Sequence, residues 1–167
     1  MNGFEELTSN VFGEEVQILL SNLKTKYKAT IPRSKQGSSV KSDVGSRERK
    51  GKSRSTSQQD LVRLFCDKSE TVMFAAMENF KFTDDEFDNL FLTAMKECQF
   101  EKLDASWHSK KALVALARNP TTPRGHLENL IKSVEEQCKT DDPYDYKHFT
   151  SYSNKMKRRA KQTLEMF

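Results

Sequence analysis

Two basic segments of this sequence have the residue types and density that fit contact with a polyanion. The first, residues 29–59, carries eight Lys and Arg against two Asp and Glu. Such cations can neutralise backbone phosphates and release counterions, which gives salt-dependent affinity without sequence preference. The segment has no aromatic residue to stack on bases, so sequence readout is not expected from it. The alternative is a soluble spacer whose charge resists collapse. The candidate residues are Arg33, Lys35, Lys41, Arg47, Arg49, Lys50, Lys52 and Arg54.

The second segment, 155–161, has the pattern of a basic amphipathic helix. Such a helix can meet nucleic acid, an anionic membrane surface or an acidic protein groove. The alternative is intramolecular, with Met156, Ala160 and Leu164 completing the core of the chain's own body, since residues 60–153 carry 12 Lys and Arg against 17 Asp and Glu. The candidate cations are Lys155, Lys157, Arg158, Arg159 and Lys161.

No other motif indicates catalysis or metal binding. The acidic run Asp84–Glu86 with Asp88 is better explained as the first turn of a helix, where carboxylates suit the helix dipole. The three histidines have no metal-ligand spacing, and there is no phosphate-binding loop or nucleophile motif. We therefore expect a protein that is not an enzyme and that has no cofactor and no metal site.

Cysteine usage and the N-terminus indicate a cellular compartment. The three cysteines show no C-x-x-C spacing, and an odd count without a framework favours reduced thiols in an intracellular, cytoplasmic protein. The first residues lack the basic and apolar regions of a signal peptide. No apolar run approaches the roughly 20 residues that span a bilayer.

Hydrophobic periodicity divides the chain into three parts. Residues 1–28 predict an amphipathic helix that must pack on this chain or on another protein, because a lone helix of this length is marginal in water. Its stripe comprises Phe12, Val16, Leu19, Leu20, Leu23 and Tyr27, and the first five of these are candidate partner-binding residues. Residues 29–59 predict a disordered basic linker. Residues 60–167 predict a helical-repeat domain that ends in the basic helix.

An internal duplication at offset 40 supports the helical-repeat prediction. Residues 69–98 and 109–138 share one apolar pattern and several identities, including Asn79 with Asn119. Each unit is predicted to be a short helix, a turn and a second helix. Thr83 with Glu86 forms a capping box before the second helix of the first unit, and Thr122 is the equivalent predicted cap in the second unit. The buried stripes are predicted at Phe87, Leu90, Phe91 and Ala94, and at Leu127, Leu130, Ile131 and Val134.

The second unit, Ala115–Leu130, resembles the variant leucine-rich repeat, whose units carry the pattern A-x-N-P-x-T-P-x-x-x-L-x-x-L. The resemblance implies a right-handed solenoid of short helices and no particular activity. The first unit departs from the pattern, with Phe80 and Thr83 at the proline positions, and the spacing of 40 exceeds that family's usual unit.

The sequence thus predicts an all-α protein with two repeated hairpins, flanking helices and a disordered basic linker. The leading functional hypothesis is a regulatory adaptor that binds nucleic acid electrostatically and contacts a protein of the transcription or replication machinery. Its composition, rich in Lys, Phe and Asn, also resembles that of small regulatory proteins of large tailed phages. The alternative is a virion or scaffold protein that uses a basic arm and a docking N-terminal helix.

Overall fold

The computed structural model describes residues 15–31, 43–99, 107–137 and 155–167. Every regular element among them is a helix, which confirms the all-α prediction. None of these helices is long and apolar enough to cross a membrane. In chain order they are α2 (Glu15–Lys28), α4 (Val44–Lys52), α5 (Gln58–Phe65), α6 (Glu70–Met77), α7 (Asp84–Gln99), α8 (Trp107–Arg118), α9 (Arg124–Gln137) and a C-terminal helix over 155–164.

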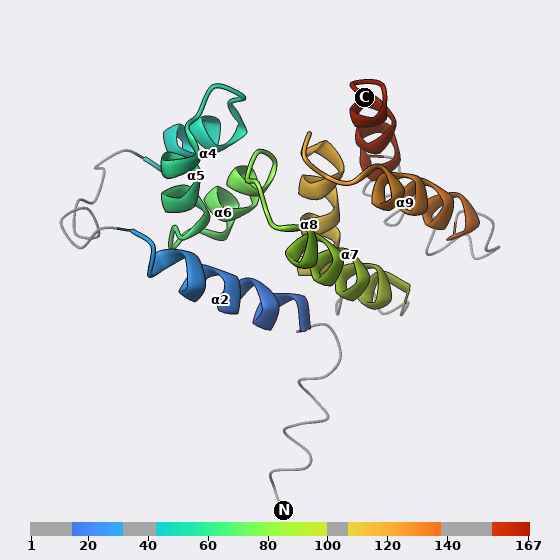
Figure 1. The fold of residues 1–167 in the computed structure, drawn as a ribbon, viewed down its shortest axis with the longest axis horizontal. Helices are drawn as coiled ribbons and strands as arrows, with labels where there is room; N and C mark the ends of the chain where they lie inside the picture. The colour runs from blue at the N-terminus through green and yellow to red at the C-terminus, as the bar shows by residue number, and fades with distance from the viewer. Residues whose placement is uncertain (1–14, 32–42, 100–106, 138–154) are drawn as a thin grey trace, which may run out of the picture.

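From α4 to the C-terminal helix, the helices follow one another across the molecule in sequence order, and α2 lies along one side of them (Figure 1). Helix α4 packs on α6, α6 packs on α8, and the C-terminal helix bonds to α8. Helices α5, α7 and α9 lie beside this row, with α5 against α6 and α7 against both α8 and α9. Helix α2 contacts α5, α7 and α8, so the first helix of the described chain joins elements that are far apart in sequence.

An aromatic cluster fills the core between α2, α5 and the turn before α7. The Phe80 ring centroid lies 4.6 Å from that of Phe82 and 5.0 Å from that of Phe65, and Tyr27 meets Phe80 edge-on at 4.8 Å. Such aromatic pairs contribute beyond the area they bury. The predicted α7 stripe is confirmed, with Phe87, Leu90, Phe91 and Ala94 all buried. In the α9 stripe Leu127, Leu130 and Val134 are buried, while Ile131 is partly buried against the core.

Helix α2 packs on its own domain. Val16, Leu20 and Leu23 are buried in the common core, and Leu19 packs against it. The partner-binding prediction is therefore wrong for Val16, Leu20 and Leu23, because their apolar surface is already covered within the chain. Phe12 lies outside the described residues.

Two glutamates of α7 hold the two ends of α2. Glu97 accepts from the backbone N–H of Val16 at 3.1 Å and from the Ser109 hydroxyl. Glu86 accepts from the Tyr27 hydroxyl and pairs with Lys26 at 3.2 Å. The two carboxylates satisfy polar groups at opposite ends of one helix, so α2 has a defined position along α7.

The disordered-linker prediction is wrong for residues 43–59, which include α4 and the start of α5. Asp43 caps α4 by accepting from the Ser46 N–H at 2.6 Å, and this bond lowers the pKa of the Asp43 carboxyl. The helix packs through Gly51, where an added Cβ would lie only 2.8 Å from the Ala76 nitrogen. Helix α4 therefore packs on α6 through the close approach of their backbones and not through an apolar stripe. The remainder of the predicted linker that precedes Asp43 falls mostly outside the described residues.

The turns between helices follow the predicted pattern in part. The capping box is confirmed, because Glu86 accepts from the Thr83 N–H at 2.9 Å and Thr83 accepts from the Glu86 N–H at 3.3 Å. Thr122 behaves differently, since its hydroxyl donates back to the Leu116 carbonyl at 2.6 Å. Helices α7 and α9 begin 40 positions apart, at Asp84 and Arg124, but α6 spans 8 residues and α8 spans 12. The repeated-hairpin arrangement stays a prediction.

Candidate nucleic-acid interface

The C-terminal ends of α4, α6 and α8 lie together because asparagine side chains connect them. The Asn79 amide donates to the Gly51 carbonyl at the end of α4 at 2.8 Å. The Asn119 amide donates to the carbonyls of Met77 and Phe80 at 2.7 Å each. The last carbonyls of a helix have no partner within the helix and carry its negative dipole end. Grouping three such ends therefore favours cations nearby.

Arg54, in the loop after α4, is one of these cations. Its guanidinium donates to the Asn79 side-chain oxygen and to the Arg118 carbonyl, each at 3.0 Å. Partial burial lowers the pKa of Arg54, the positive charge of Arg118 acts in the same direction, and Glu78 opposes both. Arg54 therefore lies within electrostatic range of α6 and α8 while it stays exposed.

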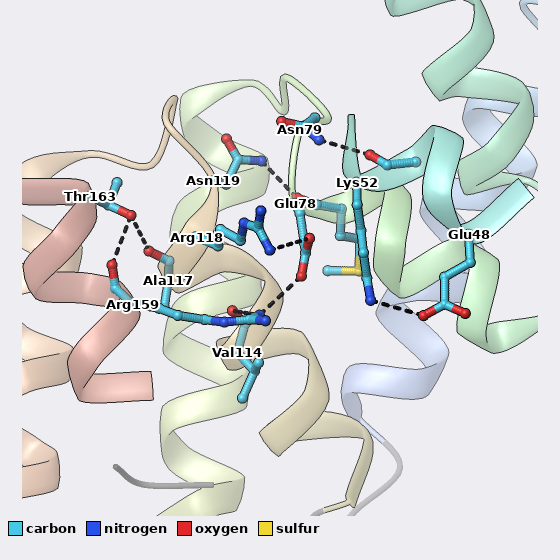
Figure 2. A network of polar contacts seen from close by, with 12 residues as sticks. Glu48, Lys52, Glu78, Asn79, Val114, Ala117, Arg118, Asn119, Arg159 and Thr163 are labelled. Atoms are coloured by element: carbon cyan, nitrogen blue, oxygen red, sulfur yellow. Dashed lines mark hydrogen bonds and ion pairs between the residues drawn. The ribbon is translucent and has the colours of Figure 1, made fainter. Parts of the chain in front are cut away.

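Glu78 is a buried carboxylate at the C-cap of α6 (Figure 2). A negative charge there opposes the helix dipole, so it needs cationic partners. Arg159 donates to Glu78 Oε1 at 3.0 Å, and both side chains are largely buried. Arg118 Nη1 lies 3.6 Å from Oε2, an ion pair too long to count as a hydrogen bond. Arg159 is thus firmly bound, whereas Arg118 is loosely held and 41% exposed.

The C-terminal helix docks on α8, as the intramolecular alternative predicted. Met156 and Ala160 are buried, and Leu164 packs against the core. Arg159 also donates to the Val114 carbonyl at 3.2 Å, and the Thr163 hydroxyl lies 2.6 Å from the Ala117 carbonyl near the end of α8. Docking by this apolar side leaves the basic side of the helix exposed.

The two predicted basic segments meet at one point. Arg54 donates to the Arg118 carbonyl, and Arg118 and Arg159 both pair with Glu78. Lys155 lies one turn before Arg159 on the same helix. Partial burial and the positive charges of Arg159 and Lys52 lower the pKa of its ammonium group. Arg158 acts in the same direction and Glu78 in the opposite one. Cations of α4 and of the C-terminal helix are therefore close enough to interact. We define the basic cluster as Lys52, Arg54, Arg118, Lys155, Arg158 and Arg159.

The other predicted nucleic-acid-binding residues do not enter the basic cluster as described. Arg33, Lys35 and Lys41 lie outside the described residues. Three more form ion pairs elsewhere: Arg47 with Asp67 at 2.8 Å, Lys50 with Asp60 at 3.2 Å, and Lys157 with Glu135 at 3.0 Å. Arg49 and Lys161 are exposed, and Arg49 donates to the Ser46 hydroxyl at 3.2 Å.

Sequence reasoning missed Glu78 and Arg118. These residues are 40 positions apart, which is the spacing of the predicted duplication. Opposite charges at equivalent positions of two units were the available signal, because equivalent positions of stacked units lie close together.

The described part of the chain gives little support to a metal site or to a reactive thiol. It contains no group of three or more His, Cys, Asp or Glu side chains that could hold a metal ion. Burial raises the pKa of the Cys66 thiol, which disfavours the reactive thiolate. The chain matches no protein-family model, curated protein or solved structure. The resemblance to the variant leucine-rich repeat therefore stays a prediction.

Proposed function

We propose that this chain is a non-enzymatic regulatory protein that binds nucleic acid through the basic cluster, without sequence preference. The observation that carries the proposal is the meeting of two basic segments more than a hundred positions apart around one buried carboxylate. A surface of this kind suits a repeated row of phosphates, and arginine matches phosphate geometry especially well.

The charge balance of the basic cluster supports this proposal over a purely structural role. Glu78 and Glu48 are the carboxylates that pair with it among the described residues. No carboxylate of the described chain pairs with Arg54, Lys155 or Arg158. Helix-end carbonyls explain part of the placement of Arg54 but neither of the other two. This excess of exposed positive charge favours the binding of an external anion.

We extend the proposed function to nucleic acid and not to the protein partner expected from the sequence. Of the residues predicted to bind that partner, Val16, Leu20 and Leu23 on α2 are buried within the chain. The scaffold alternative depended on the same residues being free. We therefore confine the proposed function to the basic cluster.

Fluorescence anisotropy with a labelled, mixed-sequence DNA duplex tests the proposal on the full chain. The variant carries Arg54→Gln, Lys155→Gln and Arg158→Gln, and we expect it to bind about tenfold more weakly or worse at low salt. The matched control carries Lys68→Gln, Lys96→Gln and Lys132→Gln, which removes the same charge from exposed positions on other elements. Equal weakening in both variants would point to net charge alone and contradict the proposal.

A further inference from the structure

The C-terminal helix brings two exposed cations, Lys155 and Arg158, to the basic cluster. Besides its apolar packing and the Lys157–Glu135 ion pair, it is held by a small number of polar contacts. Arg159 bonds to Glu78 and to the Val114 carbonyl, and Thr163 bonds to the Ala117 carbonyl. Figure 2 shows Arg159 and Thr163 on one helix facing the end of α8. These contacts fix where the exposed cations lie.

Thr163 helps to position the C-terminal helix and carries no charge. It is buried, and its hydroxyl lies 2.6 Å from the Ala117 carbonyl and 2.9 Å from the Arg159 carbonyl. The Ala117 carbonyl belongs to the last turn of α8 and has no later turn to bond to. Removing the hydroxyl would therefore leave the buried Ala117 carbonyl without this donor, and it would weaken the docking of the C-terminal helix on α8.

Docking of the C-terminal helix also brings like charges together. Lys155 comes within electrostatic range of Lys52, which belongs to α4. Their repulsion opposes the docked position. A polyanion laid across these side chains would remove the repulsion, and it would do so only while the helix is docked.

We infer that docking of the C-terminal helix and nucleic-acid binding are thermodynamically coupled, with Thr163 acting as a positioning residue. The inference rests on the proposed function. A ligand that binds the docked state more tightly than the undocked state must shift the chain toward docking. Conversely, a change that loosens the helix must weaken binding, even if it removes no charge.

Amide hydrogen exchange of the full chain, with and without the DNA duplex, tests the coupling. At a free duplex concentration ten times Kd, exchange in 155–164 should slow by about tenfold. Helix α2, which contributes no residue to the basic cluster and forms no ion pair with the described C-terminal helix, serves as the internal control and should change little.

Two variants separate positioning from simple packing. Thr163→Val should speed exchange in 155–164 of the free chain, and saturating duplex should restore slow exchange. Thr163→Ser keeps the hydroxyl, so it should behave as the parent chain. If the duplex binds while exchange in 155–164 is unchanged, the coupling is overturned and the proposed function stands. If the duplex does not bind the parent chain, the proposed function itself fails and the coupling with it.

Discussion

Arg159 donates to Glu78 across 3.0 Å, and this bond joins the C-terminal helix to the end of α6, 81 positions earlier in the chain. The side chains are 14% and 5% exposed, so neither charge is well solvated. A buried carboxylate at a helix C-terminus is unfavourable by itself. The pair therefore fixes two distant segments in one arrangement, and the basic cluster depends on it.

Removing one member of this pair should destabilise the fold. Arg159→Met keeps much of the side-chain volume and leaves Glu78 with only the long contact to Arg118. We expect the free energy of unfolding to fall by about 2–4 kcal/mol, because a buried charge loses its main partner. Arg158→Met, one position earlier and exposed, should change it by less than about 0.5 kcal/mol. Urea unfolding followed by circular dichroism measures both, and equal effects would contradict the assigned role.

A pair of glycine substitutions tests the packing of α4. A Cβ at Gly51 would lie 2.8 Å from the Ala76 nitrogen and 3.0 Å from the Ala75 carbonyl carbon, both backbone atoms. Gly51→Ala should therefore push α4 from α6 and cost about 1–3 kcal/mol of unfolding free energy.

The control for this prediction is Gly125→Ala, where no atom lies within 4 Å of the added Cβ. It should be neutral or stabilise by up to about 1 kcal/mol through helix propensity. Thermal unfolding of the two variants gives the comparison. A Gly51→Ala variant as stable as the parent chain would show that α4 does not approach α6 so closely.

The same glycine explains why α4 could not be predicted from the sequence while α7 could. Helix α7 carries an apolar stripe and a capping box, and both signals are local. Helix α4 has a single large aliphatic residue, Val44, which is 43% exposed, and it packs through Gly51. Its stability depends on contact with Ala75 and Ala76, so local composition alone gave the pattern of a disordered linker.

The basic cluster was predictable as two lists of residues but not as one surface. Lys52 and Lys155 stand out by composition, yet their proximity follows from how α4 and the C-terminal helix dock on α6 and α8. Arg118 gave no compositional signal, being one arginine at the end of an apolar helix. The role of Glu78 arises from burial, and the only sequence signal for it was its spacing of 40 positions from Arg118.

Asn119 is predicted to be essential to the stacking of α8 on α6. It is fully buried and donates to the carbonyls of Met77 and Phe80. Asn119→Ala leaves both carbonyls without this donor and should lower the free energy of unfolding by about 2–4 kcal/mol. The exposed Asn129, on α9, is the matched site, and Asn129→Ala should have little effect. Chemical denaturation distinguishes the two, and a tolerant Asn119 would contradict the stacking role.

Glu86 predicts how stability depends on pH. Burial raises the pKa of its carboxyl, but hydrogen bonds from Tyr27, the Thr83 N–H and Lys26 outweigh burial and hold the pKa below its usual 4.5. A carboxyl with a depressed pKa in the folded state stabilises the protein above the unfolded pKa, and this contribution is lost as pH falls through the folded pKa.

The measurement is the free energy of unfolding of the parent chain and of Glu86→Gln, from neutral pH to about pH 3. Glutamine keeps the size and an acceptor but cannot titrate. The advantage of the parent chain should be constant near neutrality and should shrink below about pH 4.5. A difference between the two proteins that does not change with pH would mean that the Glu86 charge contributes nothing to folding.

The central claim, that two distant segments form one nucleic-acid surface, is tested most directly by the salt dependence of duplex binding. The slope of log K against log salt is measured for the parent chain, for Lys52→Gln with Arg54→Gln, for Lys155→Gln with Arg158→Gln, and for all four substitutions together. One shared surface predicts that each pair makes the slope shallower by about 2, and the four together by about 4. A slope that either pair leaves unchanged would place that segment outside the binding surface and contradict the claim.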